Sequence, residues 1–281
     1  MIEGIGADLE VALALLAAAV GTGLVAGVLA GLLGVGGGIV IVPMLYWLLP
    51  LAGVDESVRM HLAVGTSLAT IVPTSIVSAL AHRRRGAVDA GLLRTYAPGI
   101  VAGVLIGAAF GVRAGGPVLT LIFASVALVV AADMALRRRE VQLAERPVRG
   151  PAAQAIGAFI GAVSAVMGIG GGTLSVPAFT LMGVPVHRAV GTAAAIGLII
   201  SVPGALGFML GGLDDPRLPP GSVGYVNLLA FLAIVPATML AAPHGVRLAH
   251  AISPRALRLA FAFFLLATAV RMFHNTLAGG G

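Results

Sequence analysis

The sequence GVGGGIVIVP at residues 34–43 lies within an almost unbroken apolar stretch and puts three consecutive glycines where a transmembrane helix would be expected to continue. Nearly the same ten letters, GIGGGTLSVP, recur at residues 168–177. Glycine is a poor helix former because its backbone is so free, so three in a row predict a break in a helix. Two copies in one chain indicate a duplicated structural device.

The composition is that of an integral membrane protein. Of the 281 residues, 59% are hydrophobic and 10% are charged, and the mean hydropathy is +1.06, which leaves too little polar surface to cover a soluble globule. The apolar runs show no period-two alternation, so they predict helices in a lipid bilayer. We expect an all-α, multi-pass protein of the cell inner membrane, with apolar segments at about 9–33, 39–50, 60–81, 94–113, 117–136, 152–168, 173–184, 189–210, 223–243 and 255–273.

The chain is strongly basic, with a net charge of +6 and an isoelectric point near 11.2. In a soluble protein this charge would suggest a nucleic-acid partner. Here the arginines occur in short loops between apolar runs, where they set the orientation in the membrane, so we expect no nucleic-acid partner. The chain has no cysteine, which excludes thiolate metal sites, and the sequence predicts no metal and no cofactor.

A basic linker at residues 137–150 divides the chain into two transmembrane halves, residues 1–136 and 151–281. The glycine motifs of the two halves match at a shift of 134 residues. Gene duplication explains these matches, because their order is kept while loop insertions change the shift. Further matches are AVGT at residues 63–66 with residues 189–192, His61 with His187, Pro98 with Pro236, Phe123 with Phe261 and Met134 with Met272.

Paired GxGGGxxxxP motifs, each followed within about two dozen residues by AVGT, in a chain of hydrophobic segments split by a basic linker, resemble the TauE/SafE family. That family comprises sulfite and organosulfonate exporters and is also called the toluene-sulfonate uptake permease family. The resemblance covers nearly the whole chain. It implies a transporter of a small sulfur-containing oxyanion, such as sulfite or sulfoacetate, and not an enzyme.

The number of crossings in each half depends on the short segments that follow the glycines. If these segments cross the membrane, each half has five segments and the second half is inverted relative to the first. If they are re-entrant, each half has four crossings and both halves share one orientation. The five-segment scheme, with the amino terminus outside, puts more of the arginines on the cytoplasmic side, so inverted repeats agree better with the positive-inside rule. The scheme of four crossings per half remains the alternative.

The glycine motifs predict an anion site. A segment of about 12 residues rises about 18 Å as a helix, which is too short for a hydrocarbon core of about 30 Å. Non-helical backbone must complete the crossing, and the helix that follows begins with unpaired N–H groups that favour an anion. The alternative is that the glycines only allow close helix packing. The predicted binding residues are Gly36, Gly37, Gly38, Ile39, Gly170, Gly171, Gly172 and Thr173.

Hydroxyl groups of the AVGT motifs are further candidates for binding the substrate. Thr66, Ser67 and Thr192 carry donors suited to sulfonate or sulfite oxygens. The alternative is that each hydroxyl bonds a carbonyl of its own helix, as is common in membrane helices. Ser67 has Ala193 as its counterpart, so a site that uses Ser67 is asymmetric.

Two histidines and two arginines are candidates for coupling or for a vestibule. His61 and His187 lie about one helical turn before their AVGT motifs, where a titrating imidazole would couple anion movement to protons. The alternative for each is an interfacial histidine at a helix start. Arg59 and Arg188 lie close to these histidines and would attract anions, or they are ordinary topology arginines.

The sequence lacks the residues that several other classes of function require. The segment GTS at residues 65–67 is not the GxSxG motif of a serine hydrolase, and no pair of aspartates lies in the centres of predicted segments. A cation carrier would line its path with carboxylates, which these segments do not contain. A passive anion channel or an anion exchanger for sulfate-like or carboxylate anions remains the alternative to a permease.

Overall fold

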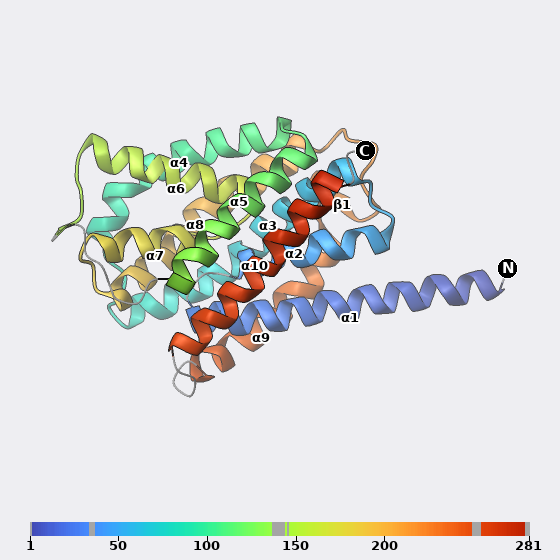
Figure 1. The fold of residues 1–281 in the computed structure, drawn as a ribbon, viewed down its shortest axis with the longest axis horizontal. Coiled ribbons are helices and arrows are strands. Elements are labelled where there is room, and N and C mark those ends of the chain that lie inside the picture. The colour runs from blue at the N-terminus through green and yellow to red at the C-terminus, as the bar shows by residue number, and fades with distance from the viewer. Residues whose placement is uncertain (1, 34–36, 137–143, 145, 249–253, 279–281) are drawn as a thin grey trace.

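The structure is a computed structural model that describes residues 2–33, 37–136, 144, 146–248 and 254–278, and this part of the chain is almost entirely helical (Figure 1). The elements of the first half are α1 (Ile2–Leu33), α2 (Gly38–Leu48), the short 3₁₀ helix η1 (Leu49–Ala52), α3 (Glu56–Arg84), α4 (Ala90–Arg113) and α5 (Gly116–Leu136). Those of the second half are α6 (Pro151–Met167), α7 (Gly172–Leu181), α8 (Val186–Gly211), β1 (Ser222–Val223), β2 (Val226–Asn227), α9 (Leu228–Leu248) and α10 (Pro254–Ala278).

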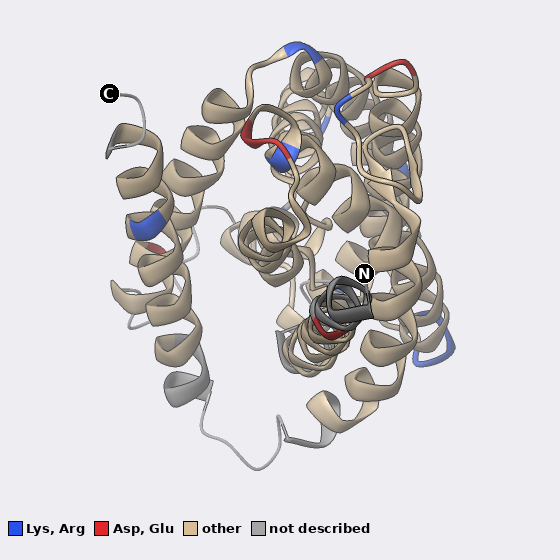
Figure 2. Cartoon of the chain, turned by 90° about the vertical axis from the view of Figure 1, so that its right-hand side faces the viewer, with Lys and Arg blue, Asp and Glu red and all other residues tan. Residues whose placement is uncertain are grey.

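Within the described residues, seven helices are long and apolar enough to cross a membrane, so the prediction of a helical multi-pass membrane protein is confirmed. Charged residues are few and lie mostly at helix ends and in turns (Figure 2). Shorter apolar helices follow each glycine motif, as the sequence predicts. One boundary was predicted wrongly: residues 223–227 belong to a small antiparallel hairpin, β1–β2, and α9 begins only at Leu228. Gly224, at φ 53°, makes this turn.

Helices α3 and α8 pack against each other at the centre of the bundle. Their contacts run in opposite directions along the two helices, since a Cβ added to Gly65 would meet Phe208, and Leu68 packs against Gly204. Further along, the Ser75 hydroxyl lies beside Gly197. The two helices are therefore antiparallel, although they occupy matching positions in the two halves.

Two other interfaces join helices of opposite halves, α4 with α6 and α1 with α9. In both, the backbones are so close that added side chains would clash: Gly103 lies against the Ala158 backbone, and a Cβ on Gly27 would lie 2.5 Å from the Thr238 carbonyl oxygen. Small residues allow this approach, which favours helix association in a membrane. Both pairs are parallel. The interfaces match under the duplication, because Gly27 corresponds to Gly161 of α6 and Gly103 to Ala241 of α9.

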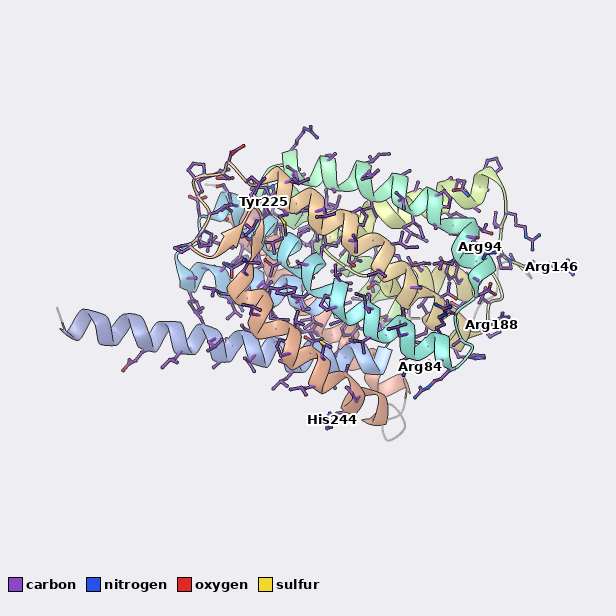
Figure 3. All side chains as sticks on the ribbon, turned by 180° about the vertical axis from the view of Figure 1, so that it is seen from behind. Arg84, Arg94, Arg146, Arg188, Tyr225 and His244 are labelled. Atoms are coloured by element: carbon purple, nitrogen blue, oxygen red, sulfur yellow. The ribbon has the colours of Figure 1, made fainter. Side chains whose placement is uncertain are left out.

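The two ends of the bundle differ in charge. Arg84, Arg94, Arg146 and Arg188 all lie at one end, which we call the arginine-rich end, and Tyr225 lies at the other, which we call the hairpin end (Figure 3). The N-terminal part of α1 projects beyond the rest of the bundle (Figure 1). Helices α5 and α10 pack against each other along one side.

The close α1–α9 contact predicts a selective sensitivity to added methyl groups. A Cβ at Gly23 would lie 2.6 Å from the Ile234 carbonyl oxygen, whereas a Cβ at Gly21 would have no atom within 4 Å. We expect Gly23→Ala to destabilise the protein by about 1–3 kcal/mol through overpacking. Gly21→Ala, on the same helix, is expected to have no such effect. Thermal unfolding in detergent measures both, and equal melting temperatures for the two variants would contradict this interface.

Candidate functional site

The first helix break precedes α2. Gly37 adopts the left-handed conformation, φ 77°, which side chains disfavour, and its carbonyl accepts the amides of Val40 and Ile41. The amides of Gly38 and Ile39 therefore begin the helix without a carbonyl of that helix to bond. Of the predicted site residues, Gly36 lies outside the described residues.

The second break lies between α6 and α7. Gly168 ends α6 with φ 67°, and the Ile169 amide donates to the Ser164 carbonyl at 3.0 Å. The first amide to bond within α7 is that of Ser175, which donates to the Gly171 carbonyl at 2.9 Å. The amides of Gly172 and Thr173, one turn earlier, thus have no carbonyl of their own helix to bond.

The two breaks meet inside the bundle. A Cβ on Gly38 would lie 2.7 Å from the Gly168 carbonyl oxygen and 3.1 Å from the Cα of Ile169, so only a glycine allows this approach. The buried Ser67 hydroxyl donates to the same Gly168 carbonyl at 2.7 Å. The first half thus contacts the second break through both α2 and α3.

The surroundings of the breaks are polar but uncharged. Among the described residues, those that are polar and buried as whole residues carry hydroxyls, apart from His61 and Asn227, and none is an arginine, aspartate or glutamate. Several hydroxyls within helices bond a carbonyl of their own helix, as Thr180 does with Val176 at 3.0 Å. The Thr173 and Ser175 hydroxyls, in contrast, are buried and have no hydrogen-bond partner. Neutral donors without partners are suited to an anion that must be released again.

The threonines of the AVGT motifs form matching contacts between the halves. The Thr66 hydroxyl oxygen accepts the Asn227 amide at 2.9 Å, and the Thr192 hydroxyl oxygen accepts the Asp89 amide at 2.9 Å. Each threonine therefore holds the segment that precedes a helix of the other half. Neither bond is to a carbonyl of the threonine's own helix, the alternative that the sequence suggested.

The glycine before each threonine lets the same segment of the other half come close to the helix. Gly65 lies against the Tyr225 carbonyl, and a Cβ on Gly191 would lie 2.5 Å from the Ala87 carbonyl oxygen. The residues held by the threonines then begin helices: Asp89 accepts the amides of Gly91 and Leu92, and the Asn227 side chain accepts the Ala230 amide. Sequence reasoning missed this pairing, although Asp89 and Asn227 match at the shift of 138 residues.

The two predicted histidines lie in different surroundings. His61 is buried, its ring centroid lies 4.8 Å from that of Tyr225, and its Nε2 lies 2.9 Å from the Ala114 carbonyl oxygen, a bond in which the imidazole donates. His187 is exposed. The arginines also differ: the Arg59 guanidinium lies 5.6 Å from the Tyr46 ring centroid, and exposed Arg188 forms an ion pair with Asp89 at 3.1 Å.

A polar network joins the hairpin end to the start of α3. The Arg217 guanidinium donates to both Asp215 carboxylate oxygens and to the Ser57 hydroxyl, and the Tyr225 hydroxyl donates to Asp215 at 2.9 Å. The bonded Arg217 holds the pKa of the Asp215 carboxyl well below its usual range. The loop that carries Asp215 and Arg217 lies against the hairpin end of α3, since Arg217 bonds Ser57 there.

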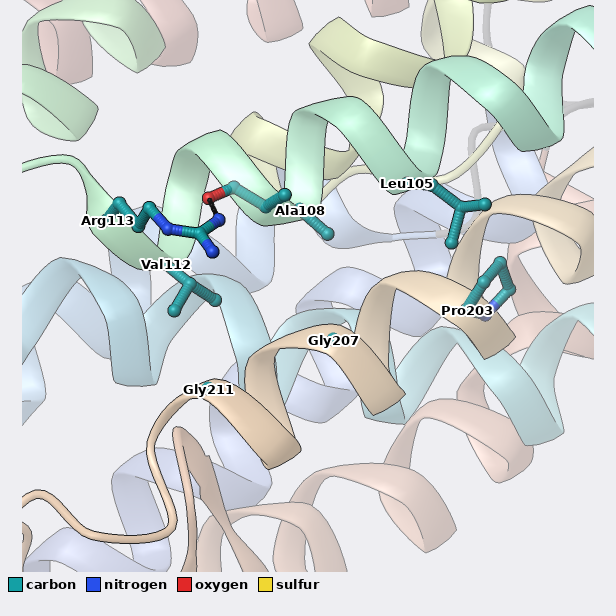
Figure 4. A pocket seen from close by; sticks show the side chains of 8 residues that line it. Leu105, Ala108, Val112, Arg113, Pro203, Gly207 and Gly211 are labelled. Carbon is teal, nitrogen blue, oxygen red and sulfur yellow. Dashed lines mark hydrogen bonds between the residues drawn. The ribbon is translucent and has the colours of Figure 1, made fainter.

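A pocket of about 330 Å³ lies between α4 and α8, away from the breaks (Figure 4). Its lining is apolar except for Arg113, whose guanidinium donates to the Ala109 carbonyl of its own helix at 3.0 Å. The residues that line the pocket are Leu105, Ala108, Ala109, Val112, Arg113, Pro203, Gly207 and Gly211.

A multi-pass bundle with two interrupted helices meeting at its centre is the architecture of a membrane transporter. The family model for the sulfite exporter TauE/SafE matches residues 19–272, so the chain belongs to this family of membrane transporters. A probable membrane transporter protein of Haemophilus influenzae is 36% identical over 251 residues, which cover 89% of this chain and 95% of the relative.

Two more distant relatives carry similar names. The probable membrane transporter protein YunE of Bacillus subtilis is 29% identical and is matched over 76% of this chain and 81% of its own length. The probable membrane transporter protein MJ0441 of Methanocaldococcus jannaschii is 24% identical over 84% of this chain and 87% of its own length. No solved structure matches the chain.

The contact between Thr66 and Asn227 predicts a structural role for this hydroxyl. We expect Thr66→Val to lower stability by about 1–3 kcal/mol, because it leaves the buried Asn227 amide without an acceptor. Thr66→Ser keeps the oxygen and is the control. Thermal unfolding distinguishes them, and a valine variant as stable as the serine variant would contradict this role.

The network at the hairpin end predicts a defined pH dependence. We expect Asp215→Asn to lower the melting temperature by about 2–4 °C at neutral pH, and Asp214→Asn, at an exposed neighbour, to leave it unchanged. Because the folded-state pKa of Asp215 is lowered, its contribution is present above the unfolded value of about 4 and is lost as the pH falls below it. Melting curves at several pH values should show the gap between parent and Asp215→Asn closing only below about pH 4. A gap that closes already near pH 6 would refute the assignment.

Proposed function

We propose that the protein is a permease that moves a small sulfur-containing oxyanion, such as sulfite or an organosulfonate, across the inner membrane. The observation that carries the proposal is the meeting of two helix breaks, Gly38 against Gly168, in buried surroundings without a charged side chain among the described residues. Unpaired amides at such helix starts favour an anion. The matching family is named for sulfite export, which supports sulfur as the central atom of the transported anion.

The proposed site lies where the two breaks approach each other. Its donors are the amides at the starts of α2 and α7, with the Thr173 hydroxyl beside them. Ser67, which bonds Gly168, and Thr66 and Thr192, which hold the opposite half, shape the site from nearby. The full proposed set is Gly36, Gly37, Gly38, Ile39, Thr66, Ser67, Gly170, Gly171, Gly172, Thr173 and Thr192.

We also propose that the halves, residues 1–136 and 151–281 joined by the linker 137–150, are inverted repeats of five segments each. The antiparallel packing of α3 with α8 supports this arrangement, because four crossings per half would make these matching helices parallel. Under the duplication, α4 corresponds to α9 and α6 to α1, so the α4–α6 interface corresponds to the α1–α9 interface. A twofold axis in the membrane plane relates interfaces in this way. The arginine-rich end is then cytoplasmic.

Ligand-dependent stability tests the proposed function. We expect sulfite or a small organosulfonate such as sulfoacetate to raise the melting temperature of the purified protein, because a ligand of the folded state stabilises it by mass action. Chloride and a neutral sulfone are the negative probes. Proteoliposomes should also take up the stabilising anion.

Matched glycine variants locate the effect. A Cβ on Gly171 would lie 2.9 Å from the Ala193 carbonyl oxygen at the start of α7, whereas a Cβ on Gly204 would meet only the Leu68 side chain. Gly171→Ala should abolish the anion effect, and Gly204→Ala should retain it. If wild type neither binds nor transports a sulfur oxyanion, the proposed function is wrong, and if folded Gly171→Ala responds fully, the site is wrong.

A further inference from the structure

The two breaks are built from matching residues, but they differ in chemistry. At a shift of 134 residues, Ile39 and Ile41 of α2 correspond to Thr173 and Ser175 of α7. All four side chains are at least nine-tenths buried. The start of the first short helix therefore carries aliphatic side chains where the start of the second carries hydroxyls.

The space beside each break also differs. Gly197 of α8 corresponds to Ile71 of α3 at a shift of 126 residues. Ile71 fills the space at the first break, where its Cδ1 would lie 2.8 Å from a Cβ on Gly38. At the second break Gly197 has no side chain, and the Ser75 hydroxyl lies at the matching position instead.

The Ser75 hydroxyl lies close to the start of α7. A Cβ on Gly197 would lie 2.6 Å from the Ser75 Oγ and 3.7 Å from the Gly171 amide nitrogen, so both polar atoms lie within 4 Å of one point. Ser75 is buried, and its hydroxyl forms no hydrogen bond within the described residues. Its hydroxyl is therefore available to a ligand at the second break.

We propose that the anion is bound asymmetrically: its side-chain donors, the hydroxyls of Ser75, Thr173 and Ser175, all lie at the second break, beside the unpaired amides at the start of α7. A helix N-terminus is suited to an anion. Here the buried Thr173 and Ser175 hydroxyls have no protein partner, and the hydroxyl of buried Ser75 lies near the Gly171 amide. The first break, with Ile39, Ile41 and Ile71, forms the apolar wall against which any substituent of the anion lies. This inference rests on the proposed function, since it assigns the donors of the same transport site.

The duplication offers a matched control for the test. Ser201 corresponds to Ser75 and is likewise buried without a hydrogen-bond partner, but it belongs to the face that matches the first break. We expect Ser75→Ala and Thr173→Val each to raise the half-saturating sulfite concentration for uptake into proteoliposomes about tenfold, the effect of one lost hydrogen bond to a charged group. Ser201→Ala should leave it unchanged. Thr173→Ser keeps the hydroxyl and should restore binding in a folded protein.

The outcomes separate the two proposals. If wild type transports sulfite and Ser201→Ala weakens uptake as much as Ser75→Ala does, the asymmetric site is wrong while the transport function stands. The same holds if folded Ser75→Ala and Thr173→Val behave as wild type. If the wild-type protein neither transports nor binds a sulfur oxyanion, the proposed function itself is wrong, and the asymmetric site is wrong with it. The sulfite-induced rise in melting temperature, measured on each variant, checks folding and binding together.

Discussion

The structure depends on how a membrane protein satisfies backbone that is not helical. Inside a bilayer no water is available for unpaired N–H groups, so a break in a helix is tolerated only where protein or a ligand surrounds it. Here both breaks are buried against each other, with Gly38 packed on the Gly168 carbonyl and Ser67 bonding that same carbonyl. The remaining unpaired amides at the start of α7 have hydroxyls beside them, and a bound anion would satisfy them.

Matching contacts hold the two proposed halves together. Each half contributes an AVGT threonine that accepts a backbone amide of the other half, Thr66 from Asn227 and Thr192 from Asp89. The paired interfaces of α1 with α9 and of α4 with α6 join the halves a second time through small residues. The contacts that join the two halves are therefore formed by matching residues. The breaks themselves then differ in chemistry, as Ile71 and Gly197 illustrate.

Much of the fold was predictable from local sequence. Hydropathy predicted the helices to within a few residues in most cases, because burial in lipid demands long apolar runs, and three consecutive glycines predicted each break. The hairpin before α9 was missed because residues 223–227 are apolar enough to continue a helix, and only Gly224 and Asn227 mark the turn. The resemblance to the TauE/SafE family was confirmed over residues 19–272.

The details of the candidate site were harder to predict. Thr66 and Asn227 are 161 residues apart, and no local pattern shows which amide a threonine hydroxyl accepts. The polar face of the second break is also not visible as a motif, because Ser75 and Gly197 come from different helices and only the packing of α3 on α8 brings them together. Aligning the two halves position by position would have shown the exchange of isoleucine for threonine, serine and glycine.

Anomalous X-ray diffraction from crystals grown with selenite, a heavier analogue of sulfite, tests the central claim most directly. The account predicts one selenium peak inside the bundle, within hydrogen-bonding distance of the amides at the start of α7 and of the Ser75 hydroxyl. Selenium found only in the pocket between α4 and α8, or only beside exposed arginines, would contradict it.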